Sequence, residues 1–276
     1  MENTVFISSE ININKRKRNF AQLALNHSFE QLIPLLLIDK ITEQELGQLR
    51  KQIISIITAR ANITSLIHDD NFESIRNTLQ QMVEHNVGNV IELGDNKYIT
   101  LTKALTAQLK IILQRSGFFN SIGLIQQFPN IRIKIGPYSA KHEHSDHPLS
   151  TSKLHCDIWA GAPKTLQICI IEILNINNGP KVEFGDIASF PRALARKLSG
   201  YDDPSAVQFL KEKVIRKVTS EEGFLHILDT YTPHRTIYPG DGIRVSIDFR
   251  IALKENLSWK DKFILKKAQF CDPNTW

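Results

Sequence analysis

Apolar positions in the first 120 residues recur with the three-to-four-residue spacing that is typical of helices. Thr42 and Glu45 have the spacing of a capping box and stand just before one such apolar series. Asp70 and Glu73 repeat this signal before a second series. A third series is expected to end at Gly117, because glycine often follows the last turn of a helix. The pattern therefore predicts that this part of the chain is a helical layer.

The pattern changes near Gln126, where alternation of apolar and polar residues replaces the helical spacing. The segment IRIKI at 131–135 alternates apolar and basic residues, which indicates a strand. A helical insertion is expected at 191–215. The remaining runs that indicate strands are TLQICIIEIL (165–174), KVEF (181–184), GFLHIL (223–228) and RVSIDFRI (244–251).

Helices followed by a run of strands predict an α+β arrangement in which the sheet forms a sandwich or a barrel. We expect one continuous domain over residues 1–276. Its parts would be a helical layer at 1–120, a β-rich core at 125–252 that carries the helical insert, and a C-terminal tail at 253–276.

Composition, cysteine spacing and apolar runs indicate the cellular compartment of the protein. The chain has 276 residues, 42% hydrophobic and 23% charged, which is ordinary for a globular protein. Its three cysteines have no CxxC spacing, which argues against a zinc ribbon or a disulfide framework. The longest apolar run, LIPLLLI at 32–38, is far shorter than a membrane span requires. We expect a cytoplasmic protein with no membrane segment.

The net charge of +5 and the pI of about 9.0 would suit an anionic partner. The excess charge is small and spread along the chain, and only two basic runs are dense. These are KRKR at 15–18 and KDKFILKK at 260–267. A solvated surface explains both runs about as well as a binding patch does.

Candidate chemistry begins in the stretch KLHCDIWAGAP at 153–163. If this stretch is a strand, His155 and Asp157 lie two residues apart on the same face. Three interpretations are open: a buried hydrogen-bonded pair, an acid/base couple, or two ligands of a metal.

His234 is a third candidate ligand, in the turn-rich stretch DTYTPHRTIYPGDG. Two histidines and one carboxylate are the ligand set of the facial triad that binds Fe(II) and leaves other coordination positions open. Open positions are needed where a co-substrate and O2 must both reach the metal.

Arg244 and Ser246 strengthen this interpretation, because two residues apart on a strand they share a face. An arginine that points into a barrel is costly unless it meets an anion. A guanidinium can hold a carboxylate through two hydrogen bonds, and a serine hydroxyl can add another. The expected anion is the distal carboxylate of 2-oxoglutarate.

The order His-x-Asp, distant His, then Arg-x-Ser resembles the Fe(II)/2-oxoglutarate-dependent oxygenases, and within them the phytanoyl-CoA-dioxygenase-like branch. The surroundings of His155 are similar to oxygenases of bacterial carbohydrate biosynthesis clusters. The resemblance covers about residues 125–252 and implies a double-stranded β-helix, a jelly-roll or cupin-like barrel. It implies that His155, Asp157 and His234 bind iron and that Arg244 and Ser246 bind 2-oxoglutarate.

The resemblance also implies a reaction. Fe(II), 2-oxoglutarate and O2 would oxidise a small metabolite, with release of succinate and CO2. The halogenating members of the family have a small residue at the position of Asp157, so its carboxylate favours hydroxylation or another oxidation. A sugar or nucleotide-sugar substrate rests on the resemblance alone.

Further residues are candidates for the same site. Thr165 and Gln167 are expected to help hold 2-oxoglutarate. Trp159 would form a wall of the substrate pocket, or else pack in the core. The other candidate substrate residues are Tyr138, His144 and Arg235.

The segment KHEHSDH at 141–147 holds His142, His144 and His147. A polar loop at the barrel mouth is the simplest interpretation of this segment. A lid over the substrate and a second metal site are the alternatives.

Two other functions stay open. Arg250 follows Arg244 by six residues, a spacing that also occurs in oxygenases that dealkylate nucleic-acid bases. However, the sequence lacks the interleaved basic and aromatic residues that would suit binding of a nucleic-acid strand. A non-redox barrel that binds a small anion through Arg244 is the second alternative. Arg132 and Lys134 share a face of IRIKI. They could line the barrel mouth and attract an anionic substrate, but a solvated strand face is the expected environment. The expected partner is a small molecule, and the oligomeric state is left open.

Overall fold

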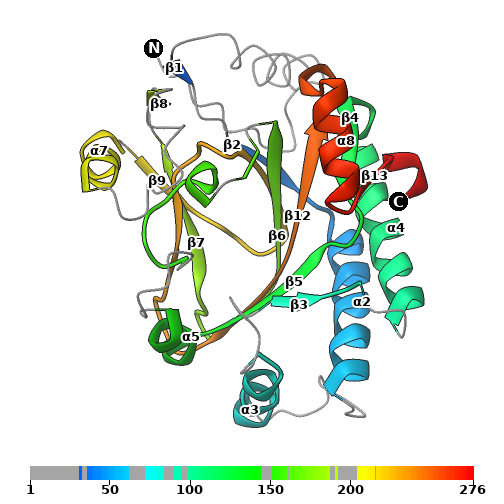
Figure 1. Ribbon diagram of the computed structural model, residues 1–276. Helices are drawn as coiled ribbons and strands as arrows, with labels where there is room; N and C mark the ends of the chain where they lie inside the picture. Colours follow the sequence, from blue (N-terminus) through cyan, green and yellow to red (C-terminus); the bar gives the residue numbers. More distant parts are fainter. Residues whose placement is uncertain are drawn as a thin grey trace.

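The computed structural model describes residues 31–32, 36–61, 72–83, 90–94, 98–143, 151–160, 162–163, 165–186, 190–191, 204–214 and 216–276 (Figure 1). Within these ranges the architecture is α+β, with helices against antiparallel sheets.

The main sheet has eight strands, and all of its pairings are antiparallel. Its principal order is β13-β4-β12-β6-β10-β2, and β5 pairs with both β12 and β3. The strands are β2 (Leu36–Lys40), β3 (Val90–Glu92), β4 (Ile122–Gln126), β5 (Asn130–Ile135), β6 (Leu166–Ile176), β10 (Phe224–Asp229), β12 (Ile243–Leu253) and β13 (Phe270–Cys271).

A smaller sheet of three strands faces the main one (Figure 1). It consists of β11 (His234–Ile237), β7 (Lys181–Asp186) and β9 (Arg216–Thr219) in that order. Two short strands, β1 (Gln31–Leu32) and β8 (Phe190–Pro191), pair separately. Apolar side chains join the two larger sheets, since Val182 and Phe184 of β7 cluster with Ile168 and Ile170 of β6.

Helices cover the other face of the main sheet, which we call the outer face. The three helices there are α2 (Glu43–Ala61), α3 (Phe72–Val83) and α4 (Ile99–Arg115). Their apolar residues form one core cluster with the isoleucines of β5, β6 and β12. The remaining helices are α5 (Gly136–Glu143), α7 (Pro204–Lys213) and α8 (Trp259–Lys267), with short 3-10 turns η3 (Phe119–Ser121), η4 (Asp157–Ala160), η5 (Lys254–Asn256) and η6 (Pro273–Thr275).

The predicted helix ends agree with the structure where they are described. Glu45 accepts a hydrogen bond from the Thr42 amide at 2.8 Å, and the Thr42 hydroxyl accepts one from the Glu45 amide at 3.1 Å. Gly117 has a φ of 76°, the left-handed conformation that ends α4 at little cost for glycine. Asp70 lies outside the described residues.

The helical layer expected over the first 120 residues is not confirmed as such. This region also contributes β1, β2 and β3. Residues 36–40 lie within the apolar run considered above for a membrane span or just after it, and they form an edge strand on β10. Edge pairing of this kind depends on a partner almost 190 residues later in the chain, which local periodicity does not reveal.

All the runs predicted as strands are strands, and the second half of the predicted insertion forms α7. Pro191, where the insertion was expected to begin, lies in β8, and residues 192–203 and 215 lie outside the described part. The predicted C-terminal tail contains α8 and the short strand β13. In the described part of the chain, no helix is long and apolar enough to cross a membrane.

Strand β12 divides the molecule into two environments. Its residues Ile243, Val245, Ile247, Phe249 and Ile251 belong to the helix-side core. The alternating residues face the smaller sheet, a side that we call the inner face. These are Arg244, Ser246, Asp248 and Arg250. The functional candidates therefore lie on the inner face.

Candidate metal centre

His155 and His234 lie side by side because their backbones are paired. The His155 amide donates to the His234 carbonyl at 3.0 Å, and the His234 amide donates to the His155 carbonyl at 2.8 Å. This reciprocal antiparallel bridge fixes two residues that are far apart in the sequence. Their imidazole rings lie 4.4 Å apart between centroids, tilted by 56°.

Two further hydrogen bonds join the residues on either side of Asp157 to the segment before His234. The Ile158 amide donates to the Thr230 carbonyl at 3.0 Å, and the Cys156 thiol donates to the Tyr231 carbonyl at 3.0 Å. Asp157 begins η4. The prediction that His155 and Asp157 share one face of a strand was therefore wrong. A tight turn, instead of the strand pleat, brings the carboxylate back towards the imidazoles.

The turn before His234 lies in the stretch predicted to be turn-rich, and Asp229 stabilises it. The carboxylate of Asp229 accepts hydrogen bonds from the Tyr231 amide and the Thr232 hydroxyl, each at 3.0 Å. Such aspartate turns reverse the chain locally, and here the turn connects β10 to β11. The sequence Asp-Thr-Tyr-Thr-Pro carries the signal, since an aspartate two residues before a backbone donor is typical of this turn.

The tautomer of both histidines is fixed by main-chain carbonyls. Nδ1 of His155 lies 2.6 Å from the Lys153 carbonyl oxygen, and Nδ1 of His234 lies 2.9 Å from the Thr232 carbonyl oxygen. Each Nδ1 must therefore carry the proton and donate it. In a neutral imidazole this leaves Nε2 with a lone pair that is directed into the site.

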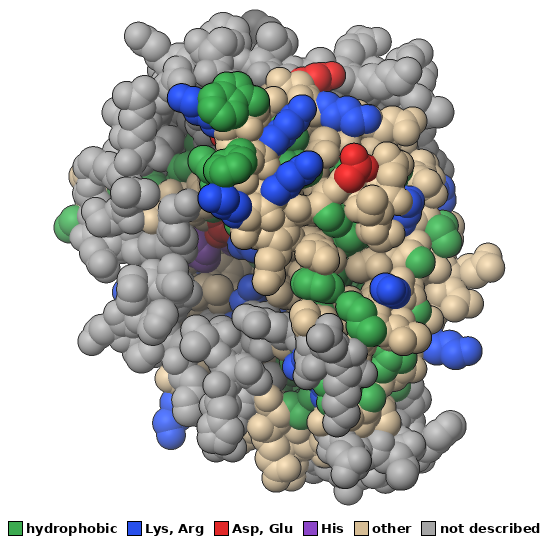
Figure 2. All heavy atoms as spheres, turned by 45° about the vertical axis from the view of Figure 1, so that its right-hand side comes forward, with side chains coloured by type: hydrophobic (Ala, Val, Ile, Leu, Met, Phe, Trp, Pro, Cys, Tyr) green, Lys and Arg blue, Asp and Glu red, His purple; other side chains and the backbone are tan. Residues whose placement is uncertain are grey.

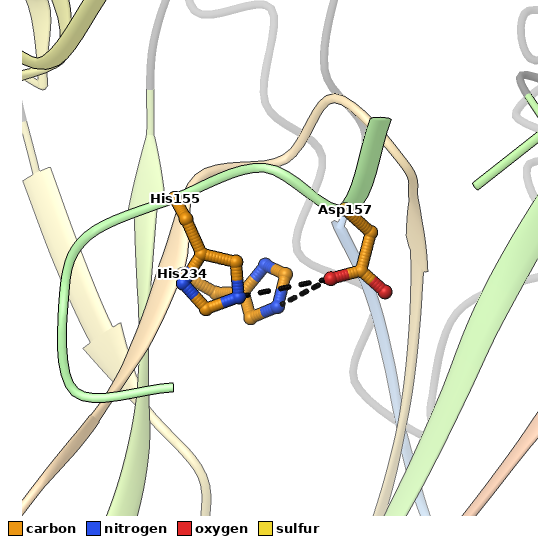
Figure 3. Close-up of side chains that lie close together, drawn as sticks. All are labelled: His155, Asp157 and His234. Atoms are coloured by element: carbon orange, nitrogen blue, oxygen red, sulfur yellow. Dashed lines mark ion pairs between the residues drawn. The ribbon is translucent and has the colours of Figure 1, made fainter. Parts of the chain in front are cut away.

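The lone pairs and the Asp157 carboxylate converge on one point (Figure 3). Oδ1 of Asp157 lies 3.3 Å from Nε2 of His234 and 3.7 Å from Nε2 of His155. One ligand atom of each residue lies within 4.8 Å of the other two, so the group can hold a metal ion. Among the described residues this is the one group of three or more such side chains with that geometry.

The electrostatics of the site favour ligand forms of His155 and Asp157. Burial lowers the pKa of His155 to about 4, so its imidazole is neutral at pH 7. Burial alone would raise the pKa of Asp157, but the hydrogen bond and charge of His234 hold that pKa well below its usual range. Burial opposes protonation of His234, yet the contact with Asp157 raises its pKa. A metal ion would replace this proton.

Arg250 contacts the other oxygen of the same carboxylate. Its Nη2 lies 3.4 Å from Oδ2 of Asp157, whereas the two histidines face Oδ1. Arg250 thus contacts the Asp157 carboxylate on the side away from the imidazoles, and Oδ1 stays directed at them. This position accounts for the second arginine of the Arg-x5-Arg spacing without a nucleic acid.

Arg244 is the most unusual charge of the inner face. Its side chain is 1% exposed, and Nε and Nη1 have no hydrogen-bond partner. Burial lowers the pKa of Arg244 to about 10, which leaves it charged at pH 7. Ser246 is also buried and lies two residues along the same strand face. Buried guanidinium nitrogens without acceptors point to an anion that the site is built to receive.

Two further cations lie beside Arg244, and their predicted environment was wrong. Lys134 is directly opposite Arg244 on β5 and is 0% exposed, while Arg132 forms an ion pair with Asp248 at 3.1 Å. Burial, with the charges of Arg132 and Arg244, lowers the pKa of Lys134 well below its usual value. A solvated strand face was expected here because apolar and basic residues alternate in IRIKI.

Three candidate substrate residues lie away from this face, so their predicted roles do not fit their positions. Trp159 lies in η4 and packs in a core cluster with Tyr231 and Leu210, in agreement with the core alternative. Tyr138 packs against the helix-side core. Arg235 follows His234 on β11, so it points to the opposite side, where it pairs with Glu183 at 2.8 Å.

Thr165 and Gln167 are buried, and neither Oγ1 of Thr165 nor Oε1 of Gln167 has a hydrogen-bond partner. Gln167 stands opposite Ile251, a member of the helix-side core. It therefore lies on the outer face of β6, away from Arg244, and its predicted role in holding the co-substrate does not fit this position. The role of Thr165 stays a prediction. His144 lies outside the described residues, as does His147, and nothing is described of the His142 side chain.

No protein-family model matches this sequence, and no curated protein matches it. Solved structures of other proteins match this chain, among them the following three. One is the non-heme alpha ketoglutarate dependent epimerase SnoN from nogalamycin biosynthesis, at 10% identity over 73% of this chain and 83% of that chain, with a TM-score of 0.38.

The other two are structures of EctD from S. alaskensis. The apoform matches at 14% identity over 86% of this chain and 78% of that chain, and the form with 2-oxoglutarate and 5-hydroxyectoine matches at 12% over 86% and 77%. Both TM-scores are 0.46. Similarities at this level do not establish a function, which must come from the residues of the site.

Proposed function

We propose that this protein is an Fe(II)- and 2-oxoglutarate-dependent enzyme that oxidises a small organic molecule. The observation that carries this proposal is the convergence of Nε2 of His155, Nε2 of His234 and the Asp157 carboxylate within 4.8 Å of one another. Two neutral imidazoles and one carboxylate are the ligand set of non-haem Fe(II) enzymes that activate O2.

The residues around the ligands suit a bound metal. Metal-binding histidines commonly donate their second ring N–H to a carbonyl, as His155 does to Lys153 and His234 does to Thr232. Arg250 supports the carboxylate on the side away from the imidazoles. The protein therefore supplies both the ligands and the groups that orient them.

The buried Arg244 suits the co-substrate. A guanidinium with Nε and Nη1 unpartnered can receive both oxygens of a carboxylate, and Ser246 can donate a hydroxyl to the same group. Lys134 lies directly opposite Arg244 on β5 and can donate hydrogen bonds to the same anion. These contacts support an assignment of the inner face of β12 as the site for the distal carboxylate of 2-oxoglutarate.

When bound, iron and 2-oxoglutarate supply the oxidising chemistry, with succinate and CO2 as co-products. The protein residues bind, orient and shield. His155 and His234 would bind the metal through Nε2, because each Nδ1 donates to a carbonyl. Asp157 would contribute a carboxylate, and Arg244 would fix the co-substrate. The two facing antiparallel sheets are compatible with a double-stranded β-helix, and barrel closure is part of the proposal.

The reaction on the substrate is the finer part of the proposal. Hydroxylation is favoured because Asp157 supplies a carboxylate where halogenating members of the resembled family have a small residue. A sugar or nucleotide-sugar rests on that resemblance alone. The cations of the inner face suit a substrate that carries an anionic group.

The test is anaerobic addition of Fe(II) and then 2-oxoglutarate to the purified protein. We expect a weak visible charge-transfer band, and succinate when air is admitted. The variant His155→Ala should lose both signals. His226→Phe is the matched control, because His226 is a buried histidine that stacks on Phe184 and is not part of the metal group.

Two outcomes would overturn the proposal. Absence of both the band and succinate in the wild-type protein would favour a barrel that binds an anion without redox chemistry. An unchanged band in His155→Ala would contradict the ligand assignment, whatever the activity.

A further inference from the structure

Helix α8 exposes an unusual set of side chains. In the described part of the chain four large hydrophobic side chains are exposed, and three of them lie on this helix of nine residues. Trp259 is 74% exposed, Phe263 is 57% exposed and Ile264 is 58% exposed. Exposed apolar residues scattered singly need no explanation, whereas a cluster indicates a contact surface.

The helix is fixed in place, so the exposure does not come from a frayed end. Ser258 and Asp261 form a complete capping box at its first turn. Leu265 is buried in a small core cluster with Leu124 and Leu166. Asp261 and Leu265 are the less exposed positions, and every other residue of α8 is exposed.

Lysines surround the apolar side chains. The helix carries Lys260, Lys262, Lys266 and Lys267 against the single acidic residue Asp261. The ammonium group of Lys267 lies 4.4 Å from the Phe263 ring centroid, and that of Lys260 lies 5.7 Å from the Trp259 ring centroid. Rings and charges therefore occupy the same surface, which we call the α8 surface.

We propose that the α8 surface binds an anionic lipid surface. Tryptophan and phenylalanine enter the interfacial region of a bilayer, while lysine stems lie along apolar groups and keep their ammonium groups at the head groups. Anionic lipids attract each lysine near the surface. Protein interfaces also use aromatic residues, but they are depleted in lysine. The combination of lysines and exposed aromatics therefore favours lipid over a protein partner.

The space-filling view relates the α8 surface to the rest of the molecule. Figure 2 shows hydrophobic and basic side chains gathered on one part of this face, beside a hollow in which a histidine side chain is visible. Leu265 of α8 packs against Leu166, the first residue of β6. Contact with a lipid surface would thus occur on the same side of the molecule as this hollow. The inference does not depend on the proposed iron chemistry.

The test is flotation with vesicles of phosphatidylcholine plus phosphatidylserine, compared with vesicles of phosphatidylcholine alone. We expect binding to the anionic vesicles and weaker binding at high salt. Each surface lysine contributes about fivefold, so Lys260→Gln with Lys267→Gln should lower the partition coefficient about 25-fold. Trp259→Ala with Phe263→Ala should lower it at least about tenfold.

Matched controls are available on other helices. Lys211 and Lys213 are exposed lysines of α7, and Lys211→Gln with Lys213→Gln should leave vesicle binding unchanged. Ile111→Ala is the apolar control, since Ile111 is exposed on α4. All variants should unfold at the wild-type temperature because they alter exposed side chains.

The proposal is overturned if the wild-type protein ignores anionic vesicles, which would assign the α8 surface to a protein contact. It is also overturned if the α8 variants bind as the wild-type protein does. Iron binding enters neither readout, so failure of this proposal is distinguishable from failure of the proposed function.

Discussion

The two faces of β12 have opposite chemical character. On the outer face Ile243, Val245, Ile247 and Phe249 pack against the helices. On the inner face Arg244, Ser246, Asp248 and Arg250 point towards the smaller sheet. A period of two along one strand thus separates an apolar core from a polar site.

The energetic character of the two faces is opposite. Burial of the outer side chains stabilises the fold by about 1.5–3 kcal/mol each, because apolar surface leaves water. Burial of Arg244 without acceptors for Nε and Nη1 costs free energy in the ligand-free protein. The outer face therefore supplies the stability that lets the inner face hold charges for a ligand.

Arg244→Met gives the largest expected effect on this comparison. The variant lacks the guanidinium proposed to bind the distal carboxylate of 2-oxoglutarate. The KM for 2-oxoglutarate should therefore rise on the order of 1000-fold. The ligand-free protein should gain about 1–3 kcal/mol in free energy of unfolding, because an unsatisfied charge is replaced by an apolar chain. Steady-state kinetics and urea unfolding measure the two changes.

The control for Arg244→Met is Arg132→Met on the same inner face. Arg132 is paired with Asp248, so its removal strands a carboxylate and should lower the free energy of unfolding. If Arg244→Met also lowered stability, its guanidinium would be a structural ion-pair partner instead of an anion site.

Ile247→Ala tests the outer face. Ile247 is fully buried in the helix-side core, and truncation should cost about 3 kcal/mol of unfolding free energy through lost burial and a cavity. The KM for 2-oxoglutarate should stay within about twofold of the wild-type value, since the strand remains paired on both sides. Ile111→Ala, at an exposed position, should change stability by less than about 0.5 kcal/mol.

The alternation that separates these two faces could be predicted from the sequence. RVSIDFRI alternates over its whole length, and the structure places it on a strand with those two sides. The capping box of Thr42 and Glu45 was equally accessible, because it depends on residues three apart. Local rules sufficed wherever the determining contacts are local.

Other features depend on contacts that local patterns do not contain. IRIKI has the pattern of a half-solvated strand, but Lys134 is fully buried. His155 and Asp157 were expected on one strand face, but the backbone pairing with His234 ends at His155 and the chain then turns into η4. The same turn puts Trp159 in the core instead of beside the ligands. The ligand set was predictable from residue types and order, but the route by which the chain assembles it was not.

His226→Phe sharpens the comparison through pH. His226 is on the inner side of β10, opposite Ile170, and burial lowers its pKa to about 4. Between pH 6.5 and 4 the unfolded state binds the proton that the folded state excludes, so stability falls as pH falls through this window. At pH 5 this proton uptake should lower the free energy of unfolding of the wild-type protein by about 2 kcal/mol. The phenylalanine variant has no imidazole at this position and should not show this loss.

The measurement is urea unfolding of the metal-free wild-type and His226→Phe proteins at pH 7 and pH 5. His155 has a similarly lowered pKa and contributes equally to both proteins, so the difference isolates His226. An identical loss of stability in the two proteins would contradict a neutral, buried His226.

Arg250 is expected to act as a positioning residue for Asp157, with the smallest effect of the four. Arg250→Lys keeps a positive charge but loses the planar group that reaches Oδ2 at 3.4 Å, so Fe(II) affinity should fall about tenfold. Arg250→Gln also loses this support, but it removes a cation that repels the metal. The Fe(II) affinity should therefore fall less in Arg250→Gln than in Arg250→Lys. Calorimetric titration with Fe(II) under anaerobic conditions measures both affinities.

The matched control is Arg235→Gln, which removes an arginine adjacent to His234 on the opposite side of β11. Because Arg235 pairs with Glu183 and points away from the ligands, Fe(II) affinity should not change. Tighter Fe(II) binding by Arg250→Gln than by the wild-type protein would mean that charge repulsion outweighs orientation. In that case Arg250 would lower the metal affinity, and Asp157 would be held in place by the contacts of its neighbours Cys156 and Ile158 with the segment before His234.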